Sequence, residues 1–288
     1  MSWLFLSLVA AASLATTDAL TKRFLSPLLP FEMGLFRLIY TLPWLTVIFL
    51  IIPWPALDRT FWWAVALSLP LEIAALLAYM KALKSSPLSL SLPFLAFTPL
   101  FVLLTGWVIL GERVTLTGLG GILLILSGAY GLNLSTVRCG LLEPLKSIGK
   151  EPGSRLMLLV AFLYAFTSTL GKLAIQHSHP LFFPAIYYGL LCSVLAFGFP
   201  LIPRARAGNL FRQPLIGLLI GTLGALSLVS HMLAISQIQV AYMVSVKRTS
   251  LLFGVLYGIF WFKEGHLPER LAAALLMMAG VFLIGWSG

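Results

Sequence analysis

Lys247 and Arg248 stand side by side within an apolar run from Ile238 to Phe262. An ionisable side chain inside a membrane-spanning helix costs about 2.5 to 3.5 kcal/mol, so such groups usually face a cavity or a charged partner. Arginine presents a forked set of donors and lysine a compact charge, and both suit a carboxylate or a phosphate. The pair therefore predicts an anion-binding site at membrane depth.

Two structural alternatives for this pair remain open. The cations lie roughly 10 Å along the helix from the start of the run, so their long side chains can reach back toward lipid headgroups. Alternatively, Glu72, near the centre of another apolar run, neutralises one cation for structural reasons only. We favour a third arrangement, which keeps that ion pair and leaves at least one cation facing the anionic group of a substrate.

Other polar side chains complete the candidate substrate-binding set. Ser245 and Thr249 widen the polar arc around the pair, because neighbours on a helix are separated by about 100°. His231 is either a hydrogen-bonded packing residue or a proton relay. Arg37 either lines a cavity or bonds helix-end carbonyls. The full set is Lys247, Arg248, Glu72, His231, Tyr79, Arg37, Ser245 and Thr249.

Several further residues suggest structural roles, either as a hinge within a helix or at helix ends. Pro93 and Pro99 fall inside one apolar run, where an interior proline removes a backbone hydrogen bond, so we expect a hinge there. Asp18 and Lys22 are four residues apart, a spacing that favours an ion pair at a helix end. Glu112 and its counterpart Glu264 stand at the membrane edge, where we expect them to cap or brace helix junctions.

The whole composition indicates a membrane protein. The chain has 288 residues, of which 60% are hydrophobic and 10% charged, whereas a soluble domain carries about 25% charged residues. The net charge of +10 is spread over short gaps between apolar blocks and forms no basic stripe, which argues against nucleic acid as a partner. A helix needs roughly 20 apolar residues to cross a bilayer. Blocks of that length fall at 3–22, 31–52, 61–81, 88–110, 115–134, 155–175, 181–202, 214–235, 240–262 and 268–286. The sequence therefore predicts ten membrane-spanning helices.

These ten predicted helices form two weakly similar halves. At a separation of 152 residues Met80 matches Met232, and Tyr79 matches His231. Because each half has an odd number of helices, the second must enter the membrane from the opposite side. We therefore expect an all-α membrane protein with two inverted five-helix repeats, at 1–134 and 155–288, around a central cavity, joined by a loop at 135–154.

The distribution of basic residues gives an independent prediction of orientation. The loops on one side carry 13 Lys and Arg residues, and those on the other side carry 3. Basic loops stay in the cytoplasm. We therefore expect a multi-pass protein of the cell (inner) membrane with both termini outside the cytoplasm.

The phrases LLTGWVILGERV, ending at Val114, and LFGVLYGIFWFKEG, ending at Gly265, repeat a glycine, an apolar turn and a glutamate. With the duplicated plan and Arg37, they resemble the ten-helix EamA-like branch of the drug/metabolite transporter superfamily. This resemblance implies that small metabolites move through a central cavity between the halves. From the inverted repeats we expect a secondary transporter working by alternating access. We expect an exporter of small metabolites such as amino acids or related carboxylate-bearing solutes.

Two other functions remain as alternatives. The sugar-phosphate translocators of this superfamily resemble the chain in having an adjacent Lys-Arg pair on the ninth helix, but they also use a lysine on the fourth, where this chain has no charge. An intramembrane enzyme needs a nucleophile with its base or metal ligands. The only close histidine pair is His177 and His179, in a short loop before Pro180. We expect no catalytic residue, metal or cofactor, and a monomer whose partners are a small-molecule substrate and the lipid bilayer.

Overall fold

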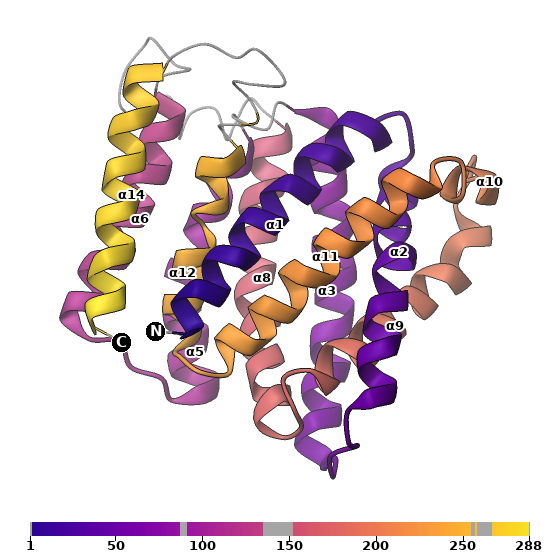
Figure 1. Cartoon of the computed structure of the whole chain (residues 1–288), viewed down its shortest axis with the longest axis horizontal. Coiled ribbons are helices and arrows are strands. Elements are labelled where there is room, and N and C mark those ends of the chain that lie inside the picture. Colours follow the sequence, from indigo (N-terminus) through magenta and orange to yellow (C-terminus); the bar gives the residue numbers. More distant parts are fainter. Residues whose placement is uncertain (1, 87–90, 135–151, 255–256, 258–266, 288) are drawn as a thin grey trace.

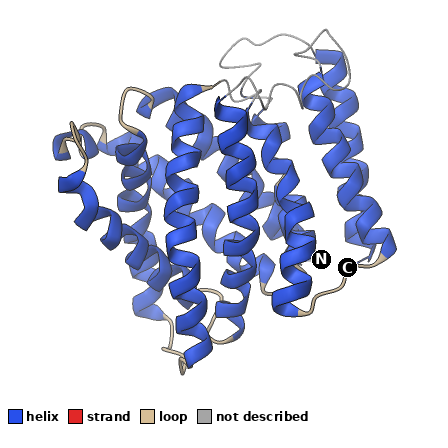
Figure 2. Ribbon diagram, turned by 180° about the vertical axis from the view of Figure 1, so that it is seen from behind, coloured by secondary structure: helices blue, strands red, loops and turns tan. Residues whose placement is uncertain are grey.

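The computed structural model of the chain describes residues 2–86, 91–134, 152–254, 257 and 267–287. Within these ranges the fold is entirely helical, with no strand, as the ribbon in Figure 2 shows. The prediction of an all-α protein is confirmed. The elements are α1 (Ser2–Leu25), α2 (Pro30–Ile51), α3 (Arg59–Ser85), η1 (Leu92–Phe97), α5 (Thr98–Leu110), α6 (Leu116–Leu134), α8 (Pro152–Gln176), α9 (Phe182–Gly198), η2 (Phe199–Leu201), α10 (Ala207–Leu210), α11 (Pro214–Ile235), α12 (Val240–Lys247) and α14 (Leu267–Ser287).

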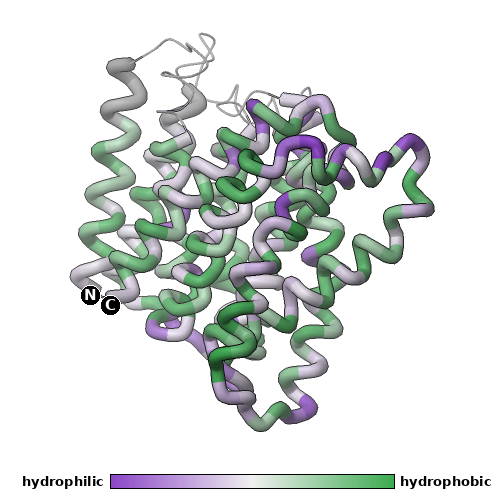
Figure 3. The backbone as a smooth tube through the Cα atoms, turned by 45° about the vertical axis from the view of Figure 1, so that its right-hand side comes forward, coloured by the Kyte–Doolittle hydropathy of each residue, from purple (hydrophilic) through white to green (hydrophobic). Residues whose placement is uncertain are grey.

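Six of these helical segments are long and apolar enough to cross a membrane: α1, α2, α3, α8, α9 with η2, and α11. Shorter apolar segments run over Phe94–Leu110, Leu116–Gly131 and Ala273–Trp286. Large apolar side chains such as Phe197 and Leu215 point outward, and Figure 3 shows hydrophilic residues gathered mainly at helix ends and loops. Such a surface requires a lipid environment, so this is a multi-pass integral membrane protein.

The fourth and ninth predicted helices are both interrupted. Residues Leu92–Phe97 form the 3₁₀ helix η1, which contains Pro93, and Pro99 lies in the first turn of α5. Proline is tolerated in a first turn because that amide has no intrahelical acceptor. The start of the fourth predicted helix, at 88–90, lies outside the described residues.

The break in the ninth helix follows Lys247. After α12 ends, the amides of Thr249 and Leu251 bond three residues back instead of four, to the carbonyls of Val246 at 3.0 Å and of Arg248 at 3.0 Å. The Thr249 hydroxyl also donates to the Val246 carbonyl at 2.8 Å, a local bond that competes with the regular helix. The end of this predicted helix, at 258–262, lies outside the described residues.

Close packing between helices depends on glycine. Figure 1 shows α1 lying beside α11, and α6 beside α14. On α11, a Cβ atom added to Gly221 would lie 2.0 Å from the Tyr40 carbonyl oxygen of α2. Only glycine allows the two backbones to approach this closely. The same contact surface includes Gly217, whose added Cβ would meet the Tyr40 ring at 2.5 Å.

Replacing Gly221 with alanine should therefore destabilise the protein. The added methyl group meets backbone atoms that cannot turn aside, and overpacking of this kind costs about 1 to 3 kcal/mol. Thermal unfolding of the purified protein in detergent measures the effect. Gly189→Ala on α9 is the matched control, because nothing lies within 4 Å of its added Cβ, and it should leave the midpoint unchanged or slightly raised.

Candidate functional site

A cavity with an empty volume of about 1340 Å³, including its open part, lies among the helices. Residues of α1, α2, α3, η1, α8, α9, α11 and α12 line it. A cavity between the helices was predicted, and residues of the first, sixth and seventh predicted helices form part of its wall. Six of the eight predicted site residues line it: Arg37, Glu72, Tyr79, His231, Lys247 and Arg248.

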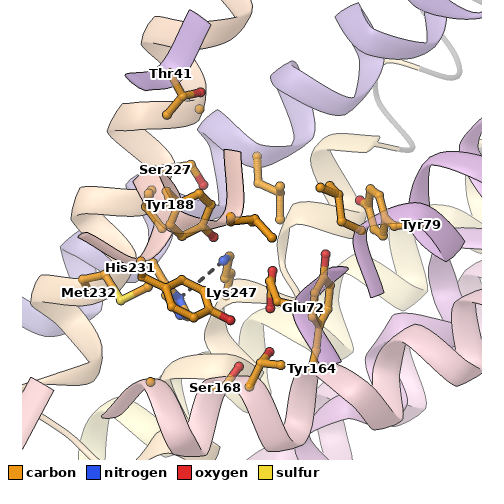
Figure 4. Close-up of a pocket in the computed structure, with 18 of the residues that line it drawn as sticks. Thr41, Glu72, Tyr79, Tyr164, Ser168, Tyr188, Ser227, His231, Met232 and Lys247 are labelled. Atoms are coloured by element: carbon orange, nitrogen blue, oxygen red, sulfur yellow. Dashed lines mark hydrogen bonds between the residues drawn. The ribbon is translucent and has the colours of Figure 1, made fainter. Parts of the chain in front are cut away.

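The two adjacent cations both border this cavity: Lys247 is the last residue of α12 and Arg248 is its C-cap. Lys247 Nζ lies 3.3 Å from His231 Nδ1, and Figure 4 shows this contact beside Glu72. Arg248 is 4% exposed, and its Nε atom has no hydrogen-bond partner. Among the residues that the structure describes, no carboxylate oxygen lies within 4.0 Å of either cation.

Arg37 and Tyr79 bind the carboxylate of Asp18, for which the sequence had predicted an ion pair with Lys22. Asp18 on α1 accepts a hydrogen bond from Arg37 Nη1 at 3.0 Å and one from the Tyr79 hydroxyl at 2.5 Å. Lys22, the predicted partner of Asp18, donates to the carbonyls of Leu83 and Ser86 at the end of α3. Asp18 is buried, so these two donors offset the cost of removing its charge from water.

Ser245 and Thr249 do not line the cavity. The Ser245 hydroxyl donates to the Ala241 carbonyl at 2.6 Å, and Thr249 donates to Val246. Both residues are buried within α12 and its continuation. On α12 and its continuation, the polar side chains that face the cavity are therefore only Lys247 and Arg248, fewer than the sequence suggested.

Three tyrosines in the cavity wall had not been singled out from the sequence. Tyr164 comes from α8, and Tyr187 and Tyr188 come from α9. The rings of Tyr187 and Tyr188 meet edge to face at a centroid distance of 5.7 Å. A usable signal was present, since interfacial tyrosines lie at the ends of spans whereas Tyr164 lies near the middle of α8.

Glu112 confirms the predicted bracing role. Its Oε1 atom accepts a hydrogen bond from Lys172 Nζ of α8 at 2.5 Å, and Oε2 accepts one from the Val240 amide of α12 at 2.8 Å. Lys172 also donates to the Ile238 carbonyl at 2.6 Å. We call these four residues the Glu112 clasp. Its predicted counterpart, Glu264, lies outside the described residues.

The histidine pair in the loop after α8 takes part in local structure. His177 Nδ1 lies 2.7 Å from an oxygen of Asp58, and His179 Nδ1 accepts the Leu181 amide at 3.2 Å. The amide of Phe61 at the start of α3, and then His177, lower the pKa of the Asp58 carboxyl. Within the described ranges, no group of three His, Cys, Asp or Glu residues is arranged to hold a metal ion.

Comparison with known proteins identifies relatives of the chain. A model of the EamA-like transporter family matches residues 1–134 and 152–286. A solved structure titled only "Crystal structure of protein" superposes with a TM-score of 0.71 at 14% identity, covering 97% of this chain and 98% of that chain. No curated protein matches significantly. The structural likeness supports the fold, and the family match covers both halves.

Proposed function

Because the chain belongs to the EamA-like transporter family, we propose that it carries small carboxylate-bearing metabolites, such as amino acids, across the cell (inner) membrane. One observation carries this proposal. Lys247 and Arg248 face the cavity, and in the described part of the chain no carboxylate oxygen lies within 4.0 Å of either. Arg248 is buried and Lys247 is half-buried. Two such cations without an anion are unfavourable, and a bound carboxylate would offset that cost.

A carboxylate fits this site better than a phosphate. The described residues of the fourth predicted helix, Leu92–Leu110, include no charged side chain. Arg37 is already paired with Asp18 and is not free to add a third cation. A dianionic phosphate bound by two cations, with the Glu72 carboxylate in the same cavity, would be poorly neutralised. A phosphorylated metabolite therefore stays the second candidate.

We propose alternating access by two inverted repeats of five helices. Helix packing supports this. The first helix of each predicted repeat packs on the third helix of the other, since α1 packs on α11 and α8 packs on α3. The two repeats also share a hydrogen bond. Lys22 donates to the carbonyl of Ser86, and Lys172 donates to the carbonyl of Ile238, which is 152 residues after Ser86. Both termini lie at the same end of the molecule (Figure 1), as ten crossings would require.

In this mechanism the Glu112 clasp closes one edge of the cavity. It joins Glu112, after the end of α5, to α8 and to the start of α12, so the repeats cannot separate there while it holds. Next to the clasp, the hydroxyls of Thr105 on α5 and Thr169 on α8 lie 2.8 Å apart and extend the contact between these two helices. Opening this edge requires these bonds to break.

Uptake into liposomes containing the purified protein tests the proposed function. Radiolabelled amino acids and short organic acids should be taken up, and the matching carboxamides should compete at least roughly tenfold more weakly, because a charged hydrogen-bonded group is removed. Sugar phosphates should compete weakly. If sugar phosphates compete well and carboxylates do not, the translocator alternative replaces this proposal.

A further inference from the structure

Glu72 of α3 faces the two cations without touching them. Its side chain lines the same cavity as Lys247, and Figure 4 shows it between the Lys247 ammonium and the Tyr164 ring. The two groups interact through space. Yet, within the described residues, the carboxylate has no cationic group within 4.0 Å. Opposite charges are therefore held across a gap and not joined as an ion pair.

Other cations do not neutralise Glu72. Arg37 and Lys172 are the other cations that line the cavity, and they are paired with Asp18 and Glu112. The hydroxyl of Thr167 lies within hydrogen-bonding reach of Glu72, but a hydroxyl does not neutralise a half-buried carboxylate. The cavity thus presents an acid that lacks a cation and two cations that lack an acid.

Tyrosine rings line the same cavity as the acid. They belong to Tyr164, Tyr187 and Tyr188, and Figure 4 shows the Tyr164 ring beside the Glu72 carboxylate. The face of an aromatic ring attracts a cation, and the attraction is strongest where water is excluded. A carboxylate in a cavity lined by several tyrosines is a suitable binding site for an ammonium group, and among the described residues no cationic group lies within 4.0 Å of it.

We propose that Glu72 and the tyrosines form an ammonium subsite, so that the carrier selects zwitterions with an amino group and a carboxylate on the same or adjacent carbons. The ammonium group bridges from Glu72 to the tyrosine rings, and the carboxylate binds Lys247 and Arg248. A zwitterion supplies both missing partners at once. This inference rests on the proposed function and adds the requirement for a free amino group.

Matched ligand pairs test the subsite. The pairs are L-leucine with 4-methylpentanoate, L-phenylalanine with 3-phenylpropanoate and L-aspartate with succinate, which differ only in the amino group. Binding to the full-length protein in detergent is measured by calorimetry. The wild type should bind the preferred amino acid at least roughly tenfold more tightly than its partner, because a charged hydrogen bond is lost. Glu72→Gln should bring the two affinities together.

A second variant keeps the carboxylate. Tyr188→Leu removes one ring and should reduce the preference by about threefold, which provides a test even where Glu72→Gln does not fold. Phe197→Leu is the matched control, because it removes a ring that points outward from the same helix α9, and it should leave the preference unchanged. Equal affinity within every pair in the wild type, or a preference that survives Glu72→Gln, overturns the subsite. If neither member of any pair binds, the proposed carboxylate site fails instead.

Discussion

Replacing Arg248 with methionine should remove most transport activity and leave the protein as stable as the wild type, or more stable. The guanidinium borders the cavity, is 4% exposed, and its Nε has no partner. Its loss removes a charged hydrogen bond to the substrate, so uptake at low substrate concentration should fall roughly ten- to hundredfold. A buried charge without a partner opposes folding, so a methionine of similar length should not lower the unfolding temperature.

Arg37→Met is the matched comparison, because Arg37 borders the same cavity and is paired. Its removal leaves Asp18 buried without its cation, and breaking such a pair costs about 3 to 5 kcal/mol. Arg37→Met should therefore lower the unfolding temperature, whereas Arg248→Met should not. The contrast separates a substrate-binding arginine from a structural one.

Uptake and thermal unfolding are measured on the same preparations. Lys247→Met provides a second reading, and we expect a smaller loss of transport because His231 remains beside the position. Unchanged uptake by both Arg248→Met and Lys247→Met would end the anion-site proposal. A large fall in the unfolding temperature of Arg248→Met would show that the guanidinium has a structural partner in the folded protein.

Hydropathy was sufficient to predict an all-helical fold with several membrane-spanning helices. Apolar length identifies spans because a bilayer demands it, and charges inside spans stand out because they are costly. Lys247, Arg248 and Glu72 were therefore visible in the sequence. The helix break after Lys247 was not, because nothing in the residue types distinguishes Thr249 as bonded to its own backbone from Thr249 as facing a cavity.

Partners across helices were harder to predict than depth. Most spans are apolar on all sides, so hydropathy does not indicate which face looks inward. Asp18 and Lys22 share a helix face, yet each bonds to residues of other helices. Asp18 accepts hydrogen bonds from Arg37 and Tyr79, and Lys22 donates to a carbonyl of α3. Tyr187 and Tyr188 were missed for the same reason, since tyrosine fits both lipid interface and interior.

Glu112→Gln should open the edge of the cavity that the Glu112 clasp closes. Glutamine keeps the shape but loses the charge that holds Lys172, and it weakens the bond to the Val240 amide. Each 1.4 kcal/mol lost shifts the closed-to-open equilibrium about tenfold, and breaking a buried ion pair costs up to about 3 to 5 kcal/mol. The population open at this edge should therefore rise at least roughly tenfold.

Labelling of a buried cysteine measures this opening. Thr169→Cys, in a background with Cys139 and Cys192 replaced by alanine, places a thiol in the contact between α5 and α8, where Thr169 is fully buried. A membrane-impermeant maleimide should label it about ten times faster when Glu112→Gln is added. Unchanged labelling would mean that the clasp does not hold this edge closed.

The charge-reversed pair, Glu112→Lys with Lys172→Glu, is the control for the ion pair itself. It restores the attraction between α8 and the end of α5, but a lysine cannot accept the Val240 amide and a glutamate cannot donate to the Ile238 carbonyl. Labelling should therefore fall to a rate between those of the wild type and Glu112→Gln. Recovery of the full wild-type rate would mean that the ion pair closes this edge without help from the two backbone bonds, whereas no recovery would assign the closure to those bonds.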